Sequence, residues 1–103
     1  MKEIKTKDEF FSFISSKELT MVVFSTHDCS TCKIVKEKID VNFEDIKTAN
    51  VYIDEIKELS GELSIFNVPV VCLFFDGKEL HRFVRIFSIS GIREKLNRIQ
   101  EFI

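Results

Sequence analysis

The chain has 103 residues, 45% of them hydrophobic, which is the size of one domain built on a single core. Its 15 basic residues are scattered among 17 acidic ones, for a net charge of −2, and this argues against a nucleic-acid-binding surface. The N-terminus has no apolar signal segment, and the longest apolar runs are too short to cross a bilayer. We therefore expect one domain over residues 1–103, located in the cytoplasm and binding neither nucleic acid nor membrane.

The first half of the chain predicts strands alternating with helices. KEIK (2–5) is a short strand, and TKDEFFSFISS (6–16) opens with the spacing of a helix capping box. LTMVVFST (19–26) is rich in β-branched and apolar residues and indicates a strand covered on both faces. Apolar residues three and four apart then predict a helix over 30–46, and ANVYID (49–54) is the next strand.

The second half predicts one more helix, a hairpin and a closing helix. EIKELSGELSIF (55–66) has helical spacing, VPVVCLFF (68–75) and ELHRFVRIF (79–87) form the hairpin, and SISGIREKLNRIQEFI (88–103) is the last helix. The order βαβαβαββα favours parallel pairing through right-handed crossovers, with an antiparallel hairpin at one edge. We expect an α/β fold with a mixed sheet of about five strands between two layers of helices.

Cys29 and Cys32 form a C-x-x-C motif at the point where a predicted strand gives way to a helix. The free N–H groups and the dipole of a helix N-terminus stabilise an anion, so a Cys29 thiolate there has a lowered pKa, about 3.5 to 7.5 at sites of this kind. Cys32 follows almost one turn later, close enough to close a disulfide. Such a pair carries out thiol–disulfide exchange: Cys29 attacks a substrate disulfide, and Cys32 then releases the substrate.

Pro69 is the single proline and opens a strand that otherwise reads as central, where proline is normally excluded. A cis peptide bond after Val68 would explain it, because it bends the chain at the strand start. The alternative is an ordinary proline on an edge strand.

Two other interpretations of the cysteine pair stay open. The thiols could be structural, or they could bind a metal or an iron–sulfur cluster, which needs about four ligands. Within one chain only His27 and Cys72 could complete such a set, and Cys72 lies in an apolar strand, where a small buried hydrophobe is expected. A cluster shared across a dimer is the remaining metal alternative. We expect no metal and no cofactor.

In their order along the chain, several segments resemble the thioredoxin family and together span nearly the whole sequence: VVFSTHDCSTCK, VYID, SIFNVPVVCLFFDGKEL and the helical tail. The resemblance implies a thioredoxin fold, with Cys29 as nucleophile, Cys32 as resolving thiol and a cis Pro69 facing them. It further implies that the backbone of Val68 pairs with an extended substrate segment.

The resemblance also implies a function. We expect a monomeric reductase of disulfide bonds in protein substrates, supplied with electrons by a thioredoxin reductase or a similar dithiol donor. A glutathione-dependent, glutaredoxin-like enzyme is one alternative, and Arg85 near the groove would be its candidate cation. A non-catalytic module that holds partners at Val68 and Pro69 is another.

The sequence departs from the family pattern around the motif, so we expect a narrower or different substrate range. Ser30 and Thr31 replace the usual Gly-Pro between the cysteines, and Val23 replaces a buried acid that assists the resolving thiol. Arg85 replaces a glycine beside the substrate groove. The family's two tryptophans and its kinking proline are also replaced, at Ser25, Asp28 and Glu37.

The charges next to the motif oppose one another. Asp28 adjoins Cys29 and should raise the pKa of its thiol, whereas a protonated His27 would lower it. His27 is therefore either a tuning residue or a solvated loop residue. Arg82 and Arg85 are interpreted as cations on a solvated strand face, and Asp54 and Glu55 are assigned no chemistry.

Overall fold

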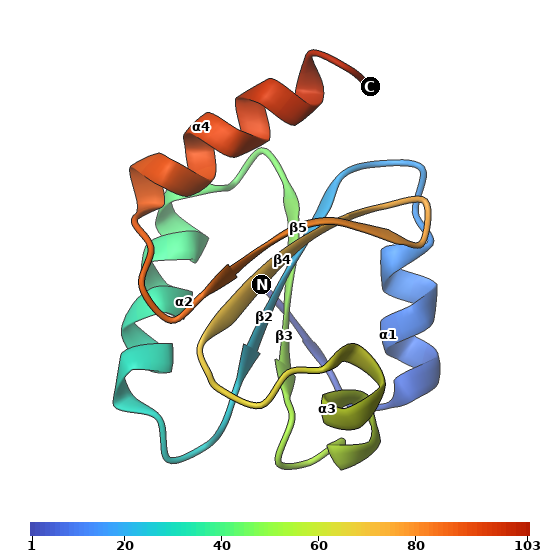
Figure 1. Cartoon of the computed structure of the whole chain (residues 1–103), viewed down its shortest axis with the longest axis vertical. Coiled ribbons are helices and arrows are strands. Elements are labelled where there is room, and N and C mark those ends of the chain that lie inside the picture. Colours follow the sequence, from blue (N-terminus) through green and yellow to red (C-terminus); the bar gives the residue numbers. More distant parts are fainter.

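A five-stranded mixed sheet lies between two layers of helices in the computed structural model, which describes all residues from 1 to 103. Helices α1 and α3 cover one face of the sheet, and α2 and α4 cover the other (Figure 1). None of the helices combines the length and apolarity needed to cross a membrane. The elements are β1 (Lys2–Ile4), α1 (Lys7–Ile14), β2 (Thr20–Ser25), α2 (Ser30–Asn42), β3 (Lys47–Tyr52), α3 (Lys57–Leu63), β4 (Val70–Phe75), β5 (Lys78–Val84) and α4 (Ile89–Gln100).

The strand order is β1-β3-β2-β4-β5, and it confirms the predicted α/β architecture. The first three strands of this order are parallel, and β4 and β5 continue the sheet in antiparallel pairing. Phe24 of β2 lies opposite Val70 of β4. The end of β2 and the beginning of β4 therefore lie side by side where the strands end, at the bottom of Figure 1. Helix α2 also begins there.

All four helices are shorter than predicted: α1 ends at Ile14 and α4 ends at Gln100, and the other two end early for visible reasons. The helix predicted over 30–46 ends at Asn42, because Phe43 leaves helical geometry while its N–H still bonds to the Ile39 carbonyl. The helix predicted over 55–66 is α3 alone, because Ser64 adopts a left-handed conformation with φ of 54°. Phe43 and Ile65 are nevertheless buried. The apolar spacing therefore runs past the end of each of these two helices. Such spacing indicates which residues are buried, and residues of irregular segments can be buried as well.

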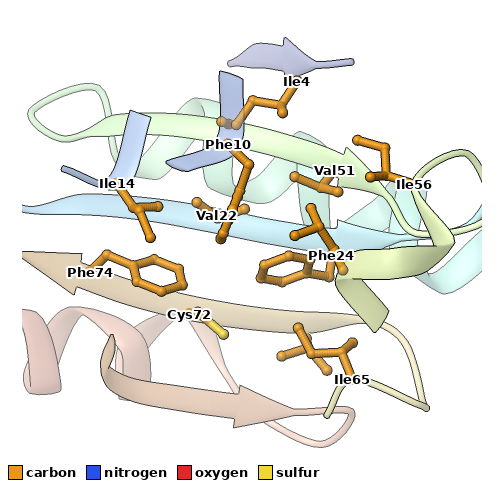
Figure 2. Packing of buried hydrophobic residues seen from close by; sticks show 13 residues of the cluster. Ile4, Phe10, Ile14, Val22, Phe24, Val51, Ile56, Ile65, Cys72 and Phe74 are labelled. Carbon is orange, nitrogen blue, oxygen red and sulfur yellow. The ribbon is translucent and has the colours of Figure 1, made fainter. Parts of the chain in front are cut away.

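The core under α1 and α3 is built on phenylalanine. Phe10 of α1 contacts Phe24 and Phe74, with ring centroids 5.9 and 5.7 Å away. Figure 2 shows the sulfur of Cys72 among these apolar side chains, next to Phe74 and Ile65. Burial raises the pKa of the Cys72 thiol to about 12. Cys72 is the expected buried hydrophobe and stays protonated at neutral pH.

The opposite core, under α2 and α4, carries the helix that begins at the C-x-x-C motif. Ile39 of α2 and Leu96 of α4 pack against Val23 and Val71 of the central strands, and all four are fully buried. This packing fixes α2 against the sheet. Since α2 starts at the edge where β2 ends, its first turn is held beside the entry to β4.

Candidate active site

Cys29 is the N-cap of α2, and Cys32 lies inside the first turn. The two cysteines form a disulfide with Cα atoms 5.2 Å apart. The Cys32 N–H donates to Cys29 Sγ at 3.1 Å, so the cap position directs a backbone donor at that sulfur. Cys29 is partly exposed, whereas Cys32 is completely buried. Of the two sulfurs, only that of Cys29 is open to another molecule.

No acidic side chain is buried behind the cysteine pair. The buried polar residues are Thr20, Ser25 and Asn50, and Val23 lies entirely within the apolar core. Asn50 stands opposite Val23 in the β2–β3 register and accepts a 2.6 Å hydrogen bond from the Ser25 hydroxyl. This neutral pair escaped the sequence analysis, because its two residues are 25 positions apart and only the sheet register joins them.

His27 is held by three side chains at the end of β3. Its Nδ1 lies 2.9 Å from Asp54 and its Nε2 lies 3.1 Å from Glu55. Its ring stacks on Tyr52 with centroids 3.8 Å apart, and the hydrogen bond to His27 lowers the pKa of Asp54. The imidazole is about half exposed, yet it is not the free loop residue of one interpretation.

Asp54 and Glu55 were assigned no chemistry from the sequence, but both contact His27 in the structure. The signal was present, because both residues directly follow a strand predicted to run parallel to the strand before the motif. The carboxyl ends of parallel strands meet at one edge of a sheet, where their following loops come together.

Asp28 and the residues between the cysteines lie on the surface. The Asp28 carboxylate accepts a 2.9 Å hydrogen bond from the Thr26 hydroxyl and forms no ion pair. Ser30 and Thr31 are both exposed in the first turn of α2. Asp28 is thus a negative charge in the loop just before the exposed sulfur of Cys29.

The Val68–Pro69 peptide bond is cis, the geometry expected for proline at the start of a central strand. Pro69 is buried and immediately precedes β4, which lies between β2 and β5, so its interpretation as an edge-strand proline is wrong. Val68 is half-buried. Because Phe24 pairs with Val70, both residues sit beside the chain that leads from β2 into the motif.

The two arginines interpreted as cations on a solvated strand face differ. Arg82 is a structural clamp: it forms an ion pair with Glu79 at 2.7 Å and donates to the Leu63 carbonyl at 2.8 Å, which ties β5 to the end of α3. The earlier interpretation of Arg82 is therefore wrong. Arg85 is exposed and left-handed, with φ of 58°, and its N–H donates to the Pro69 carbonyl at 3.0 Å.

Comparison with known proteins places this arrangement among relatives. The sequence model named Thioredoxin matches residues 2–98. The chain is 30% identical over 91 residues to the thioredoxin-like protein YdfQ of Bacillus subtilis, covering 85% of this chain and 81% of that one. It is 28% identical over 99 residues to the thioredoxin of Mycoplasmoides gallisepticum, covering 93% and 99%. Its structure resembles that of Fasciola hepatica thioredoxin, with a TM-score of 0.84 at 23% identity, covering 95% and 98%.

Proposed function

Because this chain belongs to the thioredoxin family and is a thiol–disulfide oxidoreductase, we propose that it reduces disulfide bonds in other proteins through Cys29 and Cys32. The observation that carries the assignment of roles is the unequal exposure of the pair. Cys29 is open to a partner and Cys32 is fully buried, so a substrate sulfur can reach only the first. Cys29 is then the nucleophile and Cys32 the resolving thiol.

The reaction starts from the reduced pair. The Cys29 thiolate attacks one sulfur of the substrate disulfide, the substrate S–S bond breaks, and the leaving sulfur takes up a proton. Cys32 loses its proton and attacks Cys29 Sγ, which releases the second substrate thiol and closes the Cys29–Cys32 disulfide. Two electrons pass from the pair to the substrate, so an external dithiol donor, a thioredoxin reductase or a similar system, must restore them. Such a cycle needs a reducing compartment, and we place the protein in the cytoplasm.

The fold supports the first step by stabilising the Cys29 thiolate. The Cys32 N–H already points at Cys29 Sγ, and the sulfur caps a helix of 13 residues whose dipole favours an anion at this end. No metal-binding group of three or more His, Cys, Asp or Glu side chains occurs in the chain. The proposed chemistry needs the two sulfurs and backbone donors only.

The substrate chain is proposed to lie across Val68 and Pro69. Val68 is the half-buried residue before the cis bond, at the mouth of β4, where its main chain can pair with an extended segment. Ser30 and Thr31 would face that segment from the other side, as exposed residues of the first turn of α2. One protomer supplies all of these groups, within a single domain over 1–103, and we propose that it acts as a monomer.

The test is reduction of insulin by the full chain with dithiothreitol as electron donor. Cys29→Ser should lose all activity, while Cys32→Ser should accumulate a mixed disulfide with the substrate. Cys72→Ser is the matched control and should keep wild-type activity, because that thiol is buried on the other face of the sheet. Full binding and biological activity of Cys29→Ser would identify a holding module instead. Turnover that requires glutathione as donor would identify the glutathione-dependent enzyme.

A further inference from the structure

A cleft of about 580 Å³ opens beside the C-x-x-C motif, between α2 and the segment that joins β5 to α4. Thr31 lies at the end of the cleft nearest the cysteines, and Ile34 and Phe87 contribute apolar surface. Lys38 and Arg85 are the charged residues of its lining, and none of the ten lining residues is acidic. The cleft therefore offers positive charge and apolar surface next to the reacting sulfurs.

Arg85 differs from the other arginines of the chain in having no carboxylate partner. Arg82, Arg93 and Arg98 each pair with an acid of this protein, at 2.7, 2.9 and 3.9 Å. The Arg85 guanidinium makes no ion pair or hydrogen bond within the chain, and neither does the ammonium group of Lys38. Both cations of the cleft are thus free to pair with an incoming anion.

The backbone of Arg85 links this cleft to the proposed substrate groove. Its N–H donates to the carbonyl of Pro69, the residue after the cis bond, and its side chain lines the cleft. The residue holds a left-handed conformation, which glycine adopts without the steric cost that other residues meet. Arginine at this position is less favourable for the backbone than glycine would be, but it places a long cationic side chain in the lining of the cleft.

The opposite flank of the motif carries the reverse charge. Asp28, Asp54 and Glu55 are exposed on the side of the loop that precedes Cys29, where His27 meets two of them. Asp54 and Glu55 already have partners in the chain, so Asp28 is the unpaired carboxylate that a segment crossing Cys29 meets on this flank, whereas the cleft offers two unpaired cations. This asymmetry would favour one orientation of a charged segment and disfavour its reverse.

We propose that the cleft selects protein substrates that carry Asp or Glu close to the reacting disulfide, with the acidic side chain paired to Arg85 and Lys38. The inference rests on the proposed function and specifies its substrate class. Ile34, 53% exposed, and Phe87 pack against apolar atoms of the same segment. The exposed ion pairs supply selectivity rather than most of the affinity, so the preference is modest and salt-dependent.

The test compares two peptides with the same disulfide, differing only in two residues beside one cysteine, which are Asp in one and Asn in the other. Pre-reduced full-length protein should reduce the Asp peptide roughly fivefold faster at low salt, and the ratio should approach one in high salt. Arg85→Glu should reverse the order when a Lys-flanked peptide is compared with the Asp peptide. Lys38→Gln, on α2, should lower the ratio of the Asp-peptide rate to the Asn-peptide rate. It provides the test if Arg85→Glu does not fold.

Arg98→Gln is the matched control, because it removes the same charge from a part of α4 outside the cleft. It should keep the wild-type ratio. Equal rates for the Asp and Asn peptides with wild-type protein, or an unchanged order in Arg85→Glu, would overturn the inference and leave the reductase assignment standing. Failure to reduce either peptide would contradict the proposed function itself.

Discussion

The imidazole of His27 lies almost flat on the ring of Tyr52, with centroids 3.8 Å apart and ring planes 15° from parallel. Lys36 of α2 reaches the other end of the same tyrosine, with Nζ 2.9 Å from its hydroxyl. Tyr52 thereby links the loop before Cys29 to the helix after it. We call this connected group the His27 clamp. It consists of His27, Tyr52, Asp54, Glu55 and Lys36, and it holds the loop before Cys29 against β3 and α2.

Replacing His27 by alanine should loosen this clamp. The variant loses one aromatic stack and two partly exposed contacts with carboxylates, together worth about 1 kcal/mol. For a domain of this size the melting temperature should fall by about 4–8 °C, and insulin reduction should slow because the loop that places Cys29 becomes mobile. Thermal unfolding and the insulin assay measure both effects.

His81→Ala is the control, since His81 meets the Phe83 ring edge to face on β5, away from the cysteine pair. It should cost similar stability and leave turnover unchanged. Equal losses of activity in both variants would show that His27 acts through general stability alone.

The clamp also predicts how stability depends on pH. The hydrogen bond from His27 holds the pKa of Asp54 below its ordinary value of 3.8 in the folded protein. Since the folded value is the lower one, this stabilisation is complete above the unfolded pKa and is lost as the pH falls through the folded pKa. The free energy of unfolding should therefore decline as the pH falls below the ordinary Asp pKa of 3.8.

Denaturant titrations across that pH range would measure the decline. Asp54→Asn should be less stable than wild type at pH 6 and should lose less stability on acidification. Glu101→Gln, near the C-terminus and without an ion-pair partner, should follow the wild-type curve. If the free energy of unfolding of Asp54→Asn falls with pH as steeply as that of the wild type, the acid sensitivity arises elsewhere. Asp45, whose pKa is lowered by Arg93, is one such place.

Structural features that depend on a few neighbouring residues were predictable from the sequence. The periodicity of apolar residues identified every strand and helix in order, and the position of Cys29 at the end of a strand placed it at a helix N-terminus. The rarity of proline in a central strand pointed to the cis bond before Pro69. Each inference used a few neighbouring residues and a strong physical constraint: burial, capping geometry or a missing N–H.

Contacts between distant segments were not predictable from such signals. Arg82 reads as a solvated strand residue until the fold brings the end of α3 beside it. The Ser25–Asn50 pair likewise joins residues 25 positions apart and depends on strand register. Polar side chains carry no periodic signal that reveals such partners, so the electrostatics of the site had to come from the structure.

The apolar surroundings of Val23 predict a slow resolving step. No buried carboxyl is available to take the proton from Cys32, so its deprotonation near neutral pH should limit release of the substrate. Val23→Asp should accelerate single-turnover reduction at pH 7 and lower stability by about 3 kcal/mol, because an acid is placed in the core. Val23→Asn has a similar shape and no titratable proton. It should lose stability without a gain in rate, and a rate gain in neither variant would count against the idea.

The left-handed backbone of Arg85 predicts that glycine makes the fold more stable. With φ of 58°, Arg85→Gly removes a steric cost of about 1 kcal/mol, which should appear as a higher midpoint in guanidinium unfolding. Ser64→Gly, at the left-handed C-cap of α3, should stabilise in the same way. Val84→Gly, one position earlier in regular strand geometry, should destabilise instead, because glycine weakens a strand. If Arg85→Gly is no more stable than wild type, the arginine side chain makes up for its backbone strain by contacts in the free protein, and its role in selecting substrates loses its main structural argument.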